Sequence, residues 1–347
     1  MKKLLLVLLI IASSGALALA QATFLAGEVT DTGGIDDRSF NASAWKGLQD
    51  AKAAAGVQIQ YLQSTNQSDY VPNIQQFVQK KAGIIVTVGF LMGDDTATAA
   101  KANPDQKFAI VDYSYDPAIP NVLALTYQTD QAAFLGGYLA AAMSKTGKVG
   151  TFGGMNIPTV TIFMNGFVAG VRYYNKQNKA NVQVLGWDPE GNSGTFTNDF
   201  TNQAKGKTVT ETLMNQGADI VLQLAGNSGL GVIEAVREAD QRVWAIGADI
   251  DQEDMAPGRV LVSVLKRIDV AVFDAIREAR AGQLQAGHRW IGIAEGATGL
   301  TDMRHTRRDV PDRAIEMVKR AEALIKEAKL AVPWRIEDLE TFQIPQI

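Results

Sequence analysis

The chain has 347 residues, of which 20% are charged and 46% are hydrophobic, and its formal net charge is −4. It contains no cysteine, which excludes disulfides, thiolate metal sites and a cysteine nucleophile. Nucleic-acid binding normally needs a basic surface, so this mildly acidic chain is not expected to bind nucleic acid. The length is sufficient for two domains, each with its own core.

Residues 1–20 have the three parts of a secretory signal peptide. Lys2 and Lys3 give a positive start, residues 4–12 form an unbroken apolar run, and Ala18-Leu19-Ala20 provides an A-x-A cleavage site. The apolar run is too short to cross a bilayer, which takes about 20 residues. We therefore expect cleavage after residue 20 and a mature protein in the periplasm or outside the cell. Without a cysteine, that protein has no residue for N-terminal lipid attachment.

From residue 23 onwards, short apolar runs alternate with amphipathic stretches. Strands are expected at 24–29, 57–64, 83–89, 107–113, 121–128, 148–154, 182–187, 219–225, 242–249, 260–266 and 288–294. Helices are expected around 44–48 and at 69–81, 94–102, 160–177, 203–216, 228–240, 269–282 and 310–329. This alternation predicts right-handed βαβ units and parallel sheets.

The strands fall into two series of about a hundred residues, which predicts an α/β fold of two similar lobes. Each lobe is expected to be a parallel sheet flanked by helices. The elements after residue 249 are too few for a third domain and are expected to complete the first two lobes. We assign residues 21–126 and 266–292 to the N-terminal lobe, and 127–265 and 293–347 to the C-terminal lobe. Several crossings between lobes favour a hinge over a flexible linker.

Ligands of open parallel sheets bind just beyond the carboxyl ends of the strands, and polar and aromatic residues gather at those positions. In the first series they are Asp31, Phe40, Asn41, Phe90 and Asp112. In the second series they are Asn156, Trp187, Gly226, Asp249 and Lys266. Such a set suits a small, neutral, planar and hydroxylated ligand, because rings stack on a flat heterocycle and carboxylates accept from hydroxyl or N–H groups. Lys266 can donate to a hydroxyl and also neutralise Asp249.

Each of these residues has a structural interpretation when taken alone. Asp31 and Asp249 can cap helices, Phe40 can belong to a core, and the glycines can serve turns. The binding interpretation depends on their coincidence at one edge of both predicted sheets.

Five stretches resemble the basic membrane protein family of periplasmic substrate-binding proteins, which includes purine-nucleoside receptors of ABC transporters. They are "DTGGIDDRSFNASAWKGL" (31–48), a long block at 132–173, "KGKTVTETLMNQGADIVLQLAGNSGLGVIEAV" (205–236), "IGADIDQ" (246–252) and "SVLKRID" (263–269). Nearly the whole mature chain is covered in order. The resemblance implies a type I periplasmic binding protein fold with three hinge crossings and a ligand held between the lobes.

The resemblance also implies roles for individual residues. Asp31, Asn41 and Asp112 would contact the base, and Phe40 would stack on it. Gly226, Asp249 and Lys266 would hold the ribose hydroxyls. A second stacking ring is expected from Phe200, with Phe163 and Trp187 as rivals. The segment 186–203, which contains Phe200, departs from the family pattern because it is longer and more polar. The family pattern therefore does not extend to Phe200 or to the choice of base.

The function implied is capture of a nucleoside, with a purine base preferred, by a monomer that delivers it to ABC transporter permease subunits, without cofactor or metal. Riboflavin, a free purine base or another small metabolite remains an alternative ligand. An enzyme acting on nucleosides or sugars is a second alternative, but only His288 and His305 are present, and neither a G-x-S-x-G elbow nor a phosphate-binding loop occurs. "DIDQED" departs from a calcium loop because Asp254 stands where glycine is needed.

Overall fold

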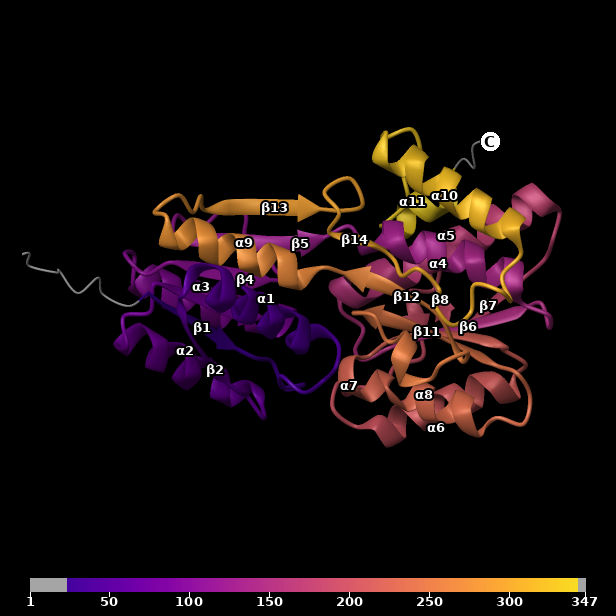
Figure 1. The fold of residues 1–347 in the computed structure, drawn as a ribbon, viewed down its shortest axis with the longest axis horizontal. Helices are drawn as coiled ribbons and strands as arrows, with labels where there is room; N and C mark the ends of the chain where they lie inside the picture. The colour runs from indigo at the N-terminus through magenta and orange to yellow at the C-terminus, as the bar shows by residue number, and fades with distance from the viewer. Residues whose placement is uncertain (1–23, 343–347) are drawn as a thin grey trace, which may run out of the picture.

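The structure, a computed structural model, describes residues 24–342. Two α/β lobes lie side by side along the long axis of the molecule, and each contains a six-stranded sheet (Figure 1). The predicted fold class is therefore confirmed. The predicted signal peptide lies outside the described residues.

The N-terminal lobe has a sheet of order β13-β5-β4-β3-β1-β2 in which all neighbouring strands are parallel. Its strands are β1 (Leu25–Val29), β2 (Gln58–Leu62), β3 (Ile84–Val88), β4 (Phe108–Val111), β5 (Val122–Tyr127) and β13 (Gly287–Ile291). Its helices are α1 (Phe40–Ala55), α2 (Tyr70–Gln79), α3 (Gly93–Ala102) and α9 (Ile268–Arg280), with short 3₁₀ turns η1 (Gln67–Asp69) and η2 (Phe90–Met92). The central strands β3 and β4 are buried throughout because helices cover both faces of the sheet.

The C-terminal lobe repeats this plan with the order β14-β12-β11-β10-β6-β7, in which only β14 is antiparallel to its neighbour. Its strands are β6 (Lys148–Gly153), β7 (Gln183–Leu185), β10 (Ile220–Leu224), β11 (Trp244–Asp249), β12 (Val260–Lys266) and β14 (Thr298–Leu300), with a separate hairpin of β8 (Trp187–Asp188) and β9 (Ser193–Gly194). Its helices are α4 (Thr129–Met143), α5 (Pro158–Asn178), α6 (Gln203–Asn215), α7 (Gly226–Gly229), α8 (Gly231–Glu238), α10 (Asp312–Lys326) and α11 (Ile336–Thr341), with the 3₁₀ turn η3 (Glu253–Met255). Strands β4 and β11 therefore occupy equivalent places in the two sheets.

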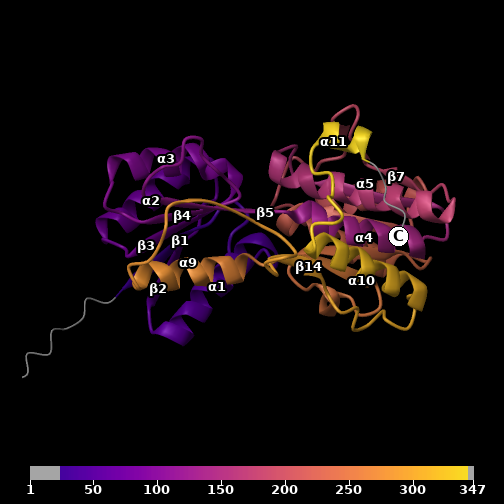
Figure 2. The same ribbon diagram turned by 90° about the horizontal axis from the view of Figure 1, so that it is seen from above.

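The chain passes between the lobes three times, from β5 to α4, from β12 to α9 and from β13 to β14 (Figures 1 and 2). Because three short connections join the lobes at one side, the lobes can rotate about that side only as two bodies on a hinge. The lobes can therefore open and close on the side opposite these connections.

Four elements were not predicted as helices or strands from the sequence, namely α4, the β8–β9 hairpin, β14 and α11. Helix α4 is buried on almost every side, so its sequence lacks the apolar stripe by which an amphipathic helix is found. The helix predicted at 228–240 is divided into α7 and α8, and the strand predicted at 182–187 ends at Leu185.

Helices α4 and α5 approach each other closely through glycines. A Cβ atom added at Gly170 would lie 2.0 Å from the carbonyl oxygen of Phe134, and one added at Gly137 would lie 2.2 Å from that of Phe167. The two backbones are therefore in direct contact beneath the sheet of the C-terminal lobe. A side chain of any size at these positions would force the helices apart.

We predict that Gly170→Ala lowers the free energy of unfolding by about 1–3 kcal/mol, the usual cost of overpacking a core. The control is Gly299→Ala, because an added Cβ there has no atom within 4 Å. Urea denaturation of the mature chain measures both. Equal stability of the two variants would contradict the close packing of α4 on α5.

Candidate functional site

A cavity lies between the lobes, where the carboxyl ends of both sheets face each other. All eight residues expected to contact a ligand line it, namely Asp31, Phe40, Asn41, Asp112, Phe200, Gly226, Asp249 and Lys266. The fold therefore brings together residues that are up to 235 positions apart in the sequence.

The four secondary candidates are divided by the structure. Phe90 and Phe163 line the cavity, whereas Asn156 lines a more open hollow that adjoins it. Trp187 lies away from the cavity, because the β8–β9 hairpin turns its indole towards α5, where Nε1 donates to Asn165 Oδ1 at 2.9 Å. Trp187 is therefore removed as a candidate for the second stacking ring.

Asp37 organises the loop between β1 and α1. Its Oδ1 accepts from the backbone N–H groups of Ser39 and Ala42, at 2.9 and 3.0 Å, and its Oδ2 accepts from that of Asn41 at 2.8 Å. These N–H groups lie at the start of α1, where the helix itself supplies no acceptor for them. Asp37 accepts from them, and its negative charge interacts favourably with the positive end of the helix dipole. Of the two adjacent acids Asp36 and Asp37, it is Asp37 that anchors the helix. Its hydrogen bonds fix the start of α1 at Phe40 and Asn41.

The amide of Asn41 is fully used by two acids. Its Nδ2 donates to Asp31 Oδ1 at 2.7 Å and to Asp37 Oδ2 at 3.0 Å, and its Oδ1 accepts from the backbone N–H of Asp31 at 3.1 Å. Asn41 therefore orients Asp31 at the cavity and has little hydrogen-bonding capacity left for a ligand. Its direct contact with a base stays a prediction, and Asn41 lines the cavity.

Asp31 presents one carboxylate oxygen to the cavity. Oδ1 is occupied by Asn41 and by the backbone N–H of Gly33 at 2.8 Å, whereas Oδ2 receives no hydrogen bond from the described residues. Gly89 faces this side chain: its φ is +124°, and an added Cβ there would lie 3.3 Å from Asp31 Oδ2. Burial raises the pKa of Asp31 to about 6, although the bonds from Asn41 and Gly33 oppose the shift. Asp31 Oδ2 is thus an open acceptor at this end of the cavity.

Asp112 follows β4 and Asp249 ends the equivalent strand β11, and each has a left-handed backbone, with φ of 69° and 66°. Aspartate tolerates this conformation better than most residues, and it turns the side chain from the strand direction into the space between the sheets. Both side chains are buried, with 6% and 9% exposed. Burial raises the pKa of both carboxyls, and the nearby ammonium of Lys266 opposes the shift.

Lys266 ends β12 and is the one basic side chain lining the cavity in the described part of the chain. Its Nζ lies 2.5 Å from Asp112 Oδ2, and it also lies 4.8 Å from the ring centre of Phe40 and 5.1 Å from that of Tyr127. The expectation that Lys266 pairs with Asp249 is corrected, since its direct partner is Asp112. Asp249 Oδ2 accepts instead from the hydroxyl of Ser39, at 2.5 Å.

Four aromatic rings reach the cavity, two from each lobe, and the two expected to stack on a ligand are Phe40 at the start of α1 and Phe200 in the segment before α6. Phe200 is fixed by close contact with Gly154, where an added Cβ would lie 2.1 Å from the ring, and its carbonyl accepts from the N–H of Ser228 at 3.2 Å. The long polar segment before it thus still delivers its ring to the cavity.

Sequence reasoning missed two residues that border this site, Ser39 and Gln252. Both are fully buried polar side chains. Ser39 adjoins the predicted Phe40 and could have been found there, whereas nothing in the pattern around Gln252 marks a buried amide. Across residues 24–342, no helix is long and apolar enough to span a membrane, and no cluster of three potential metal ligands occurs.

We predict that Lys266→Met lowers the free energy of unfolding by about 3–5 kcal/mol at pH 7, because it leaves Asp112 buried without its partner. Adding Asp112→Leu should restore much of the loss. The matched control is Lys46→Met, which breaks an exposed pair with Asp50. Chemical denaturation checks all three, and an equal loss in Lys266→Met and Lys46→Met would contradict a buried pair at the cavity.

The comparisons with known proteins agree with this architecture. The model of a family described as "ABC transporter substrate-binding protein PnrA-like" matches residues 24–332. The chain is 34% identical over 295 residues to "ABC transporter nucleoside-binding protein BmpA" of Lactococcus lactis subsp. cremoris, covering 79% of this chain and 80% of that protein. It is 31% identical over 310 residues to "Uncharacterized lipoprotein PH1714" of Pyrococcus horikoshii, covering 83% and 75%.

Among solved structures, one of the ABC transporter system solute-binding proteins from Aeropyrum pernix K1 superimposes with a TM-score of 0.84 at 26% identity, over 92% of this chain and 98% of that one. The family match covers almost every described residue, including both lobes and all three crossings. The chain therefore belongs to the PnrA-like (basic membrane protein) family of ABC transporter substrate-binding proteins.

Proposed function

We propose that the protein captures a nucleoside, preferably a purine nucleoside, in the cavity between its lobes and presents it to the permease of an ABC transporter. One observation carries the proposal: buried carboxylates, one lysine and aromatic rings from both lobes converge on a single cavity. The relative of Lactococcus lactis that is named a nucleoside-binding protein is 34% identical over 295 residues and supports the choice of ligand class.

The base is proposed to lie at the Asp31 end, stacked on Phe40 and faced by Phe200. The open Oδ2 of Asp31 is an acceptor, so it suits a base that carries an N–H donor on its edge, such as the N1–H of inosine or guanosine or the amino group of adenosine. A site built to accept such a bond discriminates strongly against analogues that lack the donor, because its own polar group is then left unpaired.

The sugar is proposed to lie at the end formed by Gly226, Asp249 and Lys266. Asp249 can accept from ribose hydroxyls, and Lys266 can donate to them while it remains paired with Asp112. Gly226 has a φ of +53°, which lets the backbone approach the sugar without a side chain. A deoxyribose ligand should bind less tightly than its ribose partner.

The charge of the cavity favours neutral ligands. Asp31, Asp112 and Asp249 surround it with one lysine, so carboxylates outnumber the ammonium. A 5′-phosphate would add negative charge to a buried site that already has an excess of it. Nucleosides are therefore proposed as ligands in preference to nucleotides.

The chain is proposed to act as a monomeric binding protein without catalysis or cofactor. The family is extracytoplasmic, and we propose the periplasm as its location, free of a lipid anchor because the sequence has no cysteine. Riboflavin, a free purine base or another small metabolite would fill the same role with different contacts, and the following experiment separates these ligands.

Isothermal titration calorimetry should detect one nucleoside per chain, with weaker binding of the matching free base, 2′-deoxynucleoside and 5′-monophosphate. Asp249→Ala should weaken the nucleoside by about tenfold or more and the free base much less, because the lost contacts are to the sugar. The same samples are analysed by chromatography after incubation. Equal weakening of both ligands would refute the sugar assignment, and appearance of a product would indicate an enzyme.

Affinity for a nucleoside should fall as the pH is lowered through 6. The acceptor form of Asp31 is the carboxylate, so ligand binding requires loss of its proton, and protonation with a pKa of about 6 should weaken binding about tenfold at pH 5 relative to pH 7. Calorimetry across pH 5–8 measures this dependence. Asp31→Asn should bind weakly at pH 7 and vary less with pH; an unchanged pH dependence in that variant would assign the titration to another group.

A further inference from the structure

The lobes touch each other directly through polar contacts beside the cavity. The loop before α1 supplies Arg38 and Ser39 from the N-terminal lobe, and the turn after β11 supplies Asp249 and Gln252 from the C-terminal lobe. Ser39 Oγ donates to Asp249 Oδ2 at 2.5 Å, and Gln252 Nε2 donates to the carbonyl oxygen of Arg38 at 3.1 Å. These bonds exist only when the lobes are closed, because each joins one lobe to the other.

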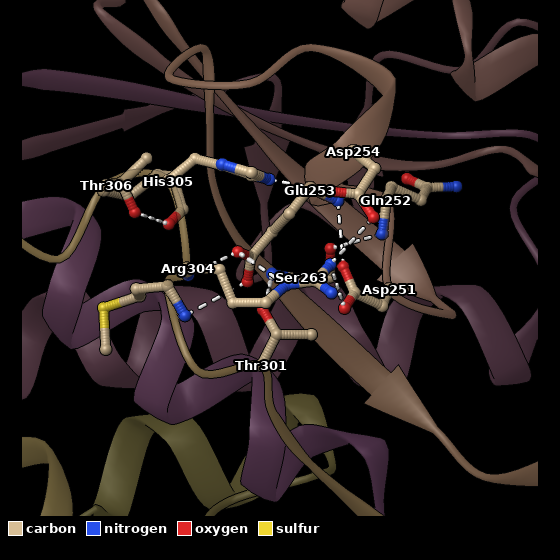
Figure 3. A network of polar contacts seen from close by, with 11 residues as sticks. Asp251, Gln252, Glu253, Asp254, Ser263, Thr301, Arg304, His305 and Thr306 are labelled. Atoms are coloured by element: carbon tan, nitrogen blue, oxygen red, sulfur yellow. Dashed lines mark hydrogen bonds and ion pairs between the residues drawn. The ribbon is translucent and has the colours of Figure 1, made fainter.

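Gln252 is held ready for this contact by its own lobe. Its Oε1 accepts from the N–H of Ala248 and from Gln223 Nε2, both at 3.2 Å, and its backbone N–H donates to Ser263 Oγ at 3.0 Å. The N–H of Ala248 and Nε2 of Gln223 hold Oε1 on the side of the C-terminal lobe. The Nε2 of the same amide group therefore points towards the N-terminal lobe. Figure 3 shows Gln252 beside Ser263 and the turn that carries it.

The following residue, Glu253, anchors the same turn. It is fully buried, and its carboxylate accepts from the backbone N–H groups of Met303 and Arg304, at 3.1 and 2.6 Å (Figure 3). Both bonds lie inside the C-terminal lobe. The turn is thus attached to the segment after β14, and little conformational entropy remains to be lost when Gln252 meets its partner.

The acceptor in the N-terminal lobe is equally fixed. Arg38 has a left-handed backbone, with φ of 50°, and lies between Asp37, the anchor of α1, and Ser39, whose N–H binds Asp37. Its carbonyl therefore points out of the loop in a set direction. Gln252 is not among the residues that line the ligand cavity, so its amide contacts the opposite lobe and not the ligand.

We propose that Gln252 is a positioning residue of the closed state, and that its bond to Arg38 forms a ligand-independent latch between the lobes. The latch stabilises closure by the same amount whatever the cavity holds. A ligand then has to supply only the rest of the closing free energy, which raises the affinity for all ligands alike. The ligand readout of this proposal rests on the proposed function.

The variant that tests the latch is Gln252→Glu. A glutamate keeps the oxygen that accepts from Ala248 and Gln223 but replaces the donor facing Arg38 with an oxygen, so a bond becomes a repulsion between two acceptors. The matched control is Glu238→Gln on α8, the reverse single-atom change at an exposed residue whose pair with Lys207 lies within one lobe and away from this turn. Urea denaturation of both variants measures how much each substitution lowers the free energy of unfolding.

We expect Gln252→Glu to weaken every nucleoside of a panel by one common factor, about tenfold, through faster dissociation, while the preference among ligands is unchanged. Glu238→Gln should keep wild-type affinity. Stopped-flow binding measures both rates. An unchanged affinity in Gln252→Glu, or a loss that differs from ligand to ligand, would overturn the latch.

A second readout needs no ligand and therefore separates failure of the latch from failure of the proposed function. Because the chain has no cysteine, Gln76→Cys on α2 and Glu211→Cys on α6 give one spin label on each lobe, on the side away from the crossings (Figure 1). Pulsed electron spin resonance of the free protein should give a smaller closed fraction in Gln252→Glu than in the wild type and in Glu238→Gln. If no nucleoside binds the wild type, the closed fraction of the free protein alone tests the latch. Equal closed fractions in all three proteins would overturn it.

Discussion

The structure depends on one electrostatic constraint: carboxylates from both lobes are buried at a common cavity with a single lysine between them. Asp112 and Asp249 come from opposite lobes, and Lys266 is paired with one and acts on the other through space. Burying charge is costly unless partners compensate for it. The free protein supplies part of the compensation, and a ligand rich in O–H and N–H donors can supply the rest. The lobes should therefore close more favourably around a neutral ligand with many O–H and N–H groups than around water alone.

The repetition of one lobe plan explains how distant residues meet. Strand β4 in one sheet and β11 in the other have equivalent places, and each has at its carboxyl end an aspartate with a left-handed backbone. Two lobes that face each other through the same sheet edge therefore present the same chemistry from both sides. The three crossings keep these edges opposed and leave rotation about the hinge as the available movement.

Much of this arrangement could be predicted from the sequence because strand ends are local features. Asp31, Asp112 and Asp249 each follow an apolar run, and the rule that ligands bind beyond parallel strands places them in the cleft. Helix α4 could not be found, because a helix buried on all sides has no polar face. The rejection of Trp187 and the pairing of Lys266 with Asp112 depend on how a hairpin turns and how two lobes close, which are properties of the three-dimensional packing.

The identity of the bound molecule tests the central claim most directly. Native mass spectrometry of the protein purified from its native cells, followed by release and identification of the bound compound, should give one nucleoside per chain. Refolded protein, freed of that compound, should regain it from a metabolite mixture in the same ratio. A flavin, an anionic nucleotide or a compound without a sugar as the retained molecule, or no retained molecule in either preparation, would contradict the account.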